Sequence, residues 1–342
     1  MGDRLNKGIA FAGTIAVDEI KKIDKYPNQS ELTTIKSFSR SNGGAVSNCA
    51  ISLAKIDPEL PIEVIALIGD DDKGHFLRER LSSYPNIDLS QVKYAGDTPF
   101  TDVMQEESGH TRTFFTYRGN LPLFNEHTIN LKKVESEILH IGYILLLDSL
   151  DQEDPVYGTK MAKVLKQAQD LGIKTSIDIV SENSNRYQKL VPPSLKYTNY
   201  CVINEIEAGK RGGIELRGES GVLKSSNVRK VLARLKELGV KEWVAIHCPE
   251  GSFGFDGMEF YSISSLLIEP DKIKGTVGAG DAYVTGVLYG ALKNLSLPEA
   301  MKVGTAAAAS SLLAEDSISG VQRYDELVRM YQELPKQPEI TI

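Results

Sequence analysis

The chain has 342 residues, 41% of them apolar and 25% charged, and carries a net charge of −7 at neutral pH. This length fits one large α/β domain or two smaller ones. The acidic balance argues against nucleic acid as the main partner, because binding a phosphate backbone requires clustered Lys and Arg. The longest dense apolar stretch, residues 141–147, is too short to span a bilayer, so we expect no membrane segment.

The three cysteines, Cys49, Cys201 and Cys248, are widely spaced and odd in number. This spacing predicts neither a zinc site nor a disulfide framework. Each lies in apolar sequence, which favours a buried, reduced thiol. The N-terminus is polar and does not read as a signal peptide, so we expect a cytoplasmic protein.

Strand-like and helix-like segments alternate along most of the chain. In the first half the apolar patterns predict strands at 9–13, 62–68 and 138–147, and helices at 45–56 and 74–81. Asp154 and Pro155 suit the cap and first residue of a helix that ends at Gly172.

The second half continues the alternation. We expect strands at 175–180, 199–203 and 243–247, and helices at 228–239, 281–313 with a break near 295–298, and 325–334. Strands that alternate with helices predict an α/β fold with a mostly parallel sheet covered on both faces. Ligands bind such sheets at the carboxyl ends of the strands.

Two segments break this rhythm. Residues 17–40 contain no clean helix, and residues 97–120 alternate like strands around a turn at Ser108-Gly109-His110. We expect them to pair as a small sheet beside the main domain. Either a lid over a ligand cleft or an edge extension of the sheet fits this pattern.

The most informative segment runs from Gly275 to Asp281, where three glycines and an alanine precede an acidic residue at a helix start. Small residues let backbone N–H groups converge, and the helix N-terminus adds positive potential, which together suit a phosphate. Asp281 would orient and deprotonate a hydroxyl that attacks this phosphate. We expect it to be exposed, with a pKa at or below about 4. Close helix packing is the alternative reason for the glycines.

Three further motifs carry polar groups. Gly43 and Gly44 open a helix in which Asn48 could hydrogen-bond a ligand hydroxyl, or could simply face solvent. Asp70-Asp71-Asp72 could bind a metal, but a solvated turn in which Asp72 caps the next helix fits better.

Asn204 and Glu207 follow an apolar strand and are three residues apart. Their oxygen atoms suit a hydrated Mg²⁺, and the same spacing suits a capping box at a helix start.

Together these motifs resemble the ribokinase-like carbohydrate kinase family, the PfkB-type sugar kinases, over roughly residues 8–335. The resemblance implies a single domain over residues 1–342, a three-layer αβα sandwich with lid segments at about 17–40 and 97–120. It also implies transfer of the γ-phosphoryl group of ATP to a hydroxyl of a monosaccharide or sugar acid.

In this family Asp281 would be the catalytic base, and the amides of Gly278, Ala279 and Gly280 the anion hole. Asn204 and Glu207 would organise Mg²⁺ through water beside the triphosphate. Further nucleotide contacts would come from Thr276 and Gly251. Substrate contacts would come from Asp18, Gly43, Gly44, Asn48, Arg118 and Asp178.

The chain also departs from the family. Many relatives have Asp at the position of Gly275, where it helps to hold a monovalent cation, so we expect little or no K⁺ dependence. The preceding strand often ends Thr-x-Gly, whose hydroxyl touches phosphate, but this chain has Ile246-His247-Cys248. That contact is lost or moved, with His247 either replacing it or packed in the core.

The acceptor is less constrained by the sequence. Tyr117-Arg118 is similar to the pair with which 2-keto-3-deoxygluconate kinases hold a carboxylate, although Arg118 could also stack on the lid. An unphosphorylated monosaccharide or a sugar acid is favoured. A nucleoside kinase and a non-catalytic binding relative remain alternatives, and the resemblance suggests a homodimer through the lid.

Overall fold

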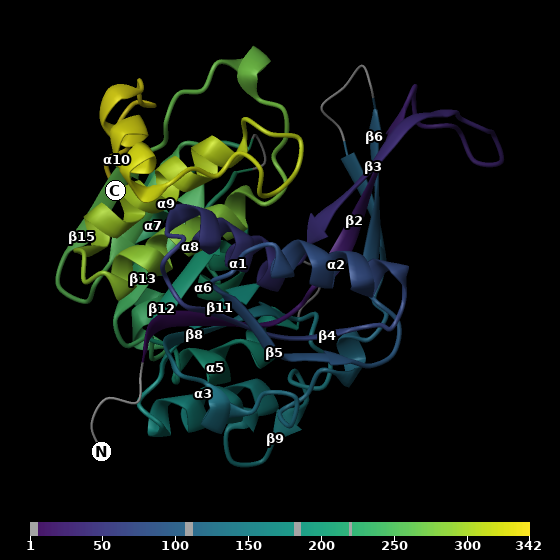
Figure 1. The fold of residues 1–342 in the computed structure, drawn as a ribbon. Coiled ribbons are helices and arrows are strands. Elements are labelled where there is room, and N and C mark those ends of the chain that lie inside the picture. The colour runs from purple at the N-terminus through teal and green to yellow at the C-terminus, as the bar shows by residue number, and fades with distance from the viewer. Residues whose placement is uncertain (1–5, 107–111, 181–185, 219–220) are drawn as a thin grey trace.

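The computed structural model describes residues 6–106, 112–180, 186–218 and 221–342 (Figure 1). Within these residues a central sheet has nine strands in the order β15-β14-β13-β12-β11-β8-β1-β4-β5. The strands from β5 to β13 are parallel, and β14 and β15 extend the sheet by antiparallel pairing. The strands are β1 (Asn6–Gly13), β4 (Ile62–Ile68), β5 (Ile87–Tyr94), β8 (Ser136–Ile144), β11 (Lys174–Ile179), β12 (Tyr200–Asn204), β13 (Trp243–Cys248), β14 (Gly251–Phe255) and β15 (Phe260–Ser264).

Helices cover both faces of this sheet, which explains the continuous apolar runs of its strands. One core lies beneath α1 (Ala45–Ile56), α2 (Asp72–Ser82), α8 (Ala279–Leu292), α9 (Leu297–Ser311) and α10 (Tyr324–Glu333). A second core lies beneath α3 (Lys160–Asp170), α4 (Tyr187–Leu190), α5 (Pro192–Leu195), α6 (Glu205–Gly212) and α7 (Ser225–Glu237). The result is the expected three-layer α/β arrangement.

A separate four-stranded sheet, here called the small sheet, stands to one side of the main body (Figure 1). It consists of β2 (Ala16–Ile23), β3 (Ile35–Gly43), β6 (Phe100–Glu106) and β7 (Arg112–Tyr117), in the order β3-β2-β6-β7. The two segments that break the alternation in sequence therefore pair with each other, β2 with β6 in parallel. The expected turn at Ser108–His110 lies outside the described residues.

The topology creates a crevice at the carboxyl ends of the strands. β1 pairs with β4 on one side and with β8 on the other, so the chain reverses its direction of winding at β1. In open parallel sheets ligands bind at such a switch point, outside the strand ends. The small sheet begins directly after β1 and therefore starts at this crevice.

Some local predictions were wrong. Asp154 does not cap a helix: it ends the short strand β9 (Glu153–Asp154), and its carboxylate accepts the N–H groups of Val156 and Tyr157 in a turn before β10 (Gly158–Thr159). Thr159 caps α3 instead, accepting from the Ala162 N–H. An Asp-Pro pair suits a turn as well as a helix start, and the downstream threonine supplied the better cap.

The acidic run before α2 also differs in detail from the prediction. Asp71, not Asp72, is the cap: its carboxylate accepts the N–H of Gly74 at 2.8 Å and the N–H and hydroxyl of Thr98. In the described part of the chain no three His, Cys, Asp or Glu side chains are grouped to hold a metal ion. Among the same residues, no helix is long and apolar enough to cross a membrane. All three cysteines are buried.

Candidate functional site

Asp281 lies in the first turn of α8, and two donors from distant elements hold its carboxylate. The Asn48 amide on α1 donates to one oxygen at 2.8 Å, and the Tyr143 hydroxyl at the end of β8 donates to the other at 2.8 Å. Ser317 in turn donates to the Asn48 carbonyl oxygen at 2.8 Å, which fixes the orientation of the amide. The acidic group therefore has one defined position.

The expectation of an exposed Asp281 with a low pKa is wrong. Its side chain is only 6% exposed. Burial raises the pKa of Asp281, because desolvation disfavours the charged form, while the bonds from Asn48 and Tyr143 partly oppose this rise. The carboxylate is thus a stronger base than a solvated aspartate.

A cavity of about 230 Å³ adjoins Asp281 at the carboxyl ends of the strands. It brings together residues that are distant in sequence but were predicted to act together. Its lining includes the predicted residues Asp178, Asn204, Glu207, Gly278, Gly280 and Asp281, together with Tyr143 and His247.

The glycines at this site leave room for other groups. Gly278 is in the left-handed region with φ 81°, and a Cβ there would lie 2.4 Å from the Cβ of Ser317. A Cβ on Gly43 would lie 2.4 Å from a carboxylate oxygen of Asp18, so this glycine lets the carboxylate approach the start of α1. The predicted contacts Asp18 and Gly43 are thus neighbours.

Carboxylates crowd this region. Burial, with a smaller contribution from Asp281, raises the pKa of Asp18 to about 7. Burial also raises the pKa of Asp178 well above its usual range, and the charges of Glu207 and Asp281 add to this. Each ionised group in this cluster makes ionisation of its neighbours less favourable.

Asn204 and Glu207 form the capping box of α6. The Asn204 side chain accepts the Glu207 N–H at 2.9 Å, the Glu207 carboxylate accepts the Asn204 N–H at 3.1 Å, and the two side chains bond at 2.7 Å. The capping alternative therefore describes their local geometry, and both residues also line the cavity.

A larger and mainly apolar pocket of about 600 Å³ shares Asn204, His247 and Gly280 with the small cavity, so the two adjoin at the N-terminus of α8. The predicted nucleotide contacts Thr276 and Gly251 line it, together with Ala279 of the predicted anion hole. Its apolar walls include Leu266, Ile268, Ile273, Ala308, Ala309 and Leu312. A volume of this size with one polar end suits a nucleotide whose phosphates point toward Asp281.

His247 lies at the junction of the two cavities. Its ring packs against Tyr283 with centroids 4.8 Å apart, so it is both a packed residue and a lining residue. Burial lowers the pKa of His247 to about 4, and the ring is therefore neutral at pH 7. A neutral imidazole can donate one hydrogen bond without adding charge.

Gly275 has no room for a side chain. A Cβ there would lie 2.8 Å from the carbonyl oxygen of Ala314 and 2.9 Å from that of Glu315. An aspartate at this position would require this backbone to move.

Arg118 does not line either cavity. Its guanidinium donates to the carbonyl of Leu146 at 2.7 Å and to the carboxylate of Asp148 at 2.9 Å, on the loop that follows β8. The guanidinium that we expected to bind the acceptor therefore bonds other groups of the protein.

Sequence reasoning missed Tyr143 and Ser317. Tyr143 stands in an apolar run with no motif, and its contact with Asp281 spans 138 residues. The one available signal was a hydroxyl-bearing residue at the carboxyl end of a strand, which is a common position for functional groups.

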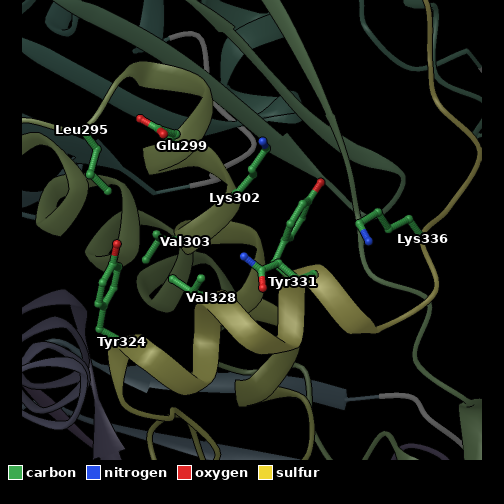
Figure 2. Close-up of a pocket in the computed structure, with 9 residues that line it drawn as sticks. Leu295, Glu299, Lys302, Val303, Tyr324, Val328, Tyr331 and Lys336 are labelled. Atoms are coloured by element: carbon green, nitrogen blue, oxygen red, sulfur yellow. The ribbon is translucent and has the colours of Figure 1, made fainter.

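A third cavity, of about 360 Å³, lies between α9 and α10 and contains none of the predicted site residues (Figure 2). Tyr324, Val328 and Tyr331 of α10 face Glu299, Lys302 and Val303 of α9 there. Asp281 and the glycine-rich loop do not lie in the wall of this cavity. We therefore place the chemistry at Asp281 and not here.

The raised pKa of Asp18 predicts a pH-dependent stability. The folded state holds the Asp18 proton up to about pH 7, whereas an unfolded aspartate loses it near pH 3.8, so this group makes stability fall as pH rises through that window. Asp18→Asn removes the effect. We expect the variant to raise the melting temperature more at pH 8 than at pH 5. An equal shift at both pH values would contradict the raised pKa.

Comparison with known proteins places this geometry in a family. The model of the pfkB family carbohydrate kinases matches residues 9–323. The nucleoside kinase of Methanocaldococcus jannaschii is 22% identical over 96% of this chain and 97% of its own length. The 5-dehydro-2-deoxygluconokinase of Clostridium beijerinckii is 24% identical over 93% of this chain and 91% of its own length.

The fold agrees with this match. The structure of Arabidopsis thaliana ribokinase complexed with ribose and ATP superposes with a TM-score of 0.74 at 18% identity, covering 95% of this chain and 98% of that one. A family match over nearly the whole chain, the ribokinase-like fold and the buried acid at a glycine-rich helix start lead to one conclusion. The chain belongs to the pfkB family of carbohydrate kinases.

Proposed function

We propose that this carbohydrate kinase transfers the γ-phosphoryl group of ATP to a hydroxyl of a monosaccharide or sugar acid, with Asp281 as the base. The observation that carries the proposal is the placement of a buried, doubly hydrogen-bonded carboxylate at the N-terminus of α8, in the wall of a cavity that adjoins a nucleotide-sized pocket.

The chemistry follows from this placement. Asp281 accepts the proton of the acceptor hydroxyl, whose oxygen forms a bond to the γ-phosphorus. The bond from that phosphorus to the bridging oxygen breaks, and its electron pair leaves with ADP. The backbone N–H groups of Gly278, Ala279 and Gly280 at the helix start stabilise the negative charge on the transferred group. Tyr143 and Asn48 keep the carboxylate aimed at the acceptor.

The site also suits a magnesium ion. Asn204 and Glu207 line the cavity, and the Asn204 amide N–H donates to the Glu207 carboxylate, so we infer that their oxygen atoms hold Mg²⁺ through its water ligands. When bound, the ion neutralises charge on the phosphates. The adjoining apolar pocket, with Thr276 and Gly251 in its lining, holds the nucleotide. The ATP bound to the related ribokinase supports this assignment.

A nucleoside kinase of the same fold is the second candidate. The likeness to the nucleoside kinase of M. jannaschii over nearly the full length favours it. In either case Asp18, Gly44, Asn48 and Asp178 would surround the acceptor, and the small sheet would act as its lid.

The outer face of the small sheet suggests a homodimer. Phe38 on β3 and Phe115 on β7 are 79% and 57% exposed, and both lie on the face opposite to Asp18, as their pairing with Lys21 and Asp102 shows. Two copies that packed these faces together would bury the exposed rings.

We also propose that the protein acts in the cytoplasm.

The test of the proposal is Asp281→Asn. The substitution keeps the size of the side chain and removes its ability to accept a proton, so we expect kcat to fall by about 10³-fold or more. Acceptor binding, measured by calorimetry, is expected to persist. ADP release in the presence of ATP, Mg²⁺ and a panel of sugars, sugar acids and nucleosides measures the loss. Retention of a large share of the turnover by a folded variant would refute the role of Asp281.

Gly275 predicts a second outcome. Because this position has no carboxylate and no room for one, turnover should be the same in K⁺ and in tetramethylammonium at equal ionic strength. A strong requirement for K⁺ would show that other groups bind the cation.

A further inference from the structure

The segment between α9 and α10 contains a turn, residues 316–319, that contacts a group holding the proposed base. We call it the serine turn. The hydroxyl of Ser317 donates to the side-chain carbonyl oxygen of Asn48 at 2.8 Å, and the Asn48 amide donates to Asp281 at 2.8 Å. The serine turn is therefore linked to the carboxylate of Asp281 through a single intervening side chain.

The serine turn also abuts the glycine-rich loop. A Cβ on Gly278 would lie 2.4 Å from the Cβ of Ser317 and 2.7 Å from its carbonyl oxygen, so the loop and the turn are in direct contact. Just before this loop, the N–H of Lys274 donates to the carbonyl of Leu312 at 2.8 Å. A shift of the turn would therefore disturb both the carboxylate and the N–H groups proposed to receive the phosphoryl group.

Contacts within the turn fix its shape. The Asp316 carboxylate accepts the N–H groups of Ile318 and Ser319 at 3.2 and 2.6 Å, and the Ser319 hydroxyl at 2.6 Å. The side chain of Ile318 is buried and anchors the turn in the core. Because apolar contacts are not directional, the orientation of the turn about this anchor depends on its polar contacts with other elements.

Lys55, in the last turn of α1, supplies such a contact. Its ammonium donates to the carbonyl of Ile318 at 2.9 Å and to that of Ser319 at 2.6 Å. A lysine at this place can satisfy the last carbonyls of its own helix, but Lys55 reaches residues 263 and 264 positions further along the chain. Burial lowers the pKa of Lys55, because desolvation disfavours the ammonium, and the charge of Asp316 opposes this change. The two carbonyl bonds are thus made at a cost in desolvation.

The positions of Asn48 and Lys55 on α1 are matched to the serine turn. The two residues are seven positions apart, so two helical turns bring both side chains to the same face of α1. Ser317 bonds the first, and the carbonyls of Ile318 and Ser319 accept from the second. The turn is therefore clamped at two points along the helix that also holds the Asp281 carboxylate.

Resting on the proposed kinase function, we propose that Lys55 is a positioning residue for phosphoryl transfer. It holds the serine turn against α1, so that Ser317 orients the Asn48 amide and this amide aims the carboxylate of Asp281. Hydrogen bonds from a charged donor are stronger than neutral ones, which suits Lys55 to this task. Misplacing reacting groups by about 1 Å costs roughly 100-fold in rate, so loss of a clamp that acts through two intervening side chains should cost about tenfold.

Lys55→Met tests the proposal, because it keeps an unbranched apolar stem and removes the donor. We expect kcat for ADP release to fall about tenfold and the KM values for ATP and acceptor to stay nearly unchanged, since Lys55 lines neither cavity. Lys55→Arg, whose guanidinium can also donate to both carbonyls, should recover much of kcat. A wild-type kcat in Lys55→Met would overturn the proposal.

Lys293→Met is the matched control. Lys293 follows the end of α8, and its ammonium bonds the Asp57 carboxylate at 3.0 Å and not the serine turn. We expect this variant to keep the wild-type kcat, whatever its effect on the melting temperature. A fall in kcat equal to that of Lys55→Met would show that loss of a lysine anywhere near this region is enough, and would overturn the proposal.

A double-mutant cycle with Ser317→Ala tests whether Lys55 acts through the serine turn. If it does, Ser317→Ala and the double variant Lys55→Met with Ser317→Ala should have nearly the same kcat, because the first substitution already breaks the link to Asn48. Losses that multiply in the double variant would place the action of Lys55 elsewhere, and would overturn the proposal.

Hydrogen–deuterium exchange separates this inference from the kinase function, because it needs no turnover. Exchange of the backbone amides of residues 314–320 should be faster in Lys55→Met than in the wild type and in Lys293→Met. If no acceptor gave ADP release with the wild type, the kinase proposal would fail, while faster exchange would still support the clamp. Unchanged exchange in Lys55→Met would overturn the inference, with or without turnover.

Discussion

The structure of the site depends on how one buried carboxylate is held. Asp281 stands at the start of α8, and its two oxygens receive hydrogen bonds from α1 and from the end of β8, elements that the parallel sheet brings together at its switch point. The cost of burying the charge is offset by these donors and by the helix N-terminus. The same contacts fix its direction, so that the site is formed before a substrate binds.

Further acidic groups surround Asp281. In the proposed function the helix start offers the donor phosphates a positive potential, while Asp18 and Asp178, whose pKa values are raised by burial, lie on the acceptor side.

Much of this architecture follows from the sequence, since apolar runs between turn residues predict the strands, and glycines with an acid mark the helix start. The contacts that define the base do not. Tyr143 lies in an apolar run, and only tertiary packing brings it to Asp281. The burial of Asp281 also depends on α1, which no local pattern relates to α8. The wrong helix start at Asp154 has a different origin, since an Asp-Pro pair suits a turn and a cap equally well.

The most direct test of this account is the pH profile of kcat/KM for Tyr143→Phe. Removing the donor to the carboxylate should raise the pKa of Asp281, which moves the acid limb of the profile about one unit to higher pH. Tyr289→Phe is the matched control. Tyr289 lies in the far part of α8, and its hydroxyl bonds Asp57 and not Asp281, so this variant should leave the acid limb in place. A limb that stays fixed in Tyr143→Phe would contradict the claim that this tyrosine tunes the base.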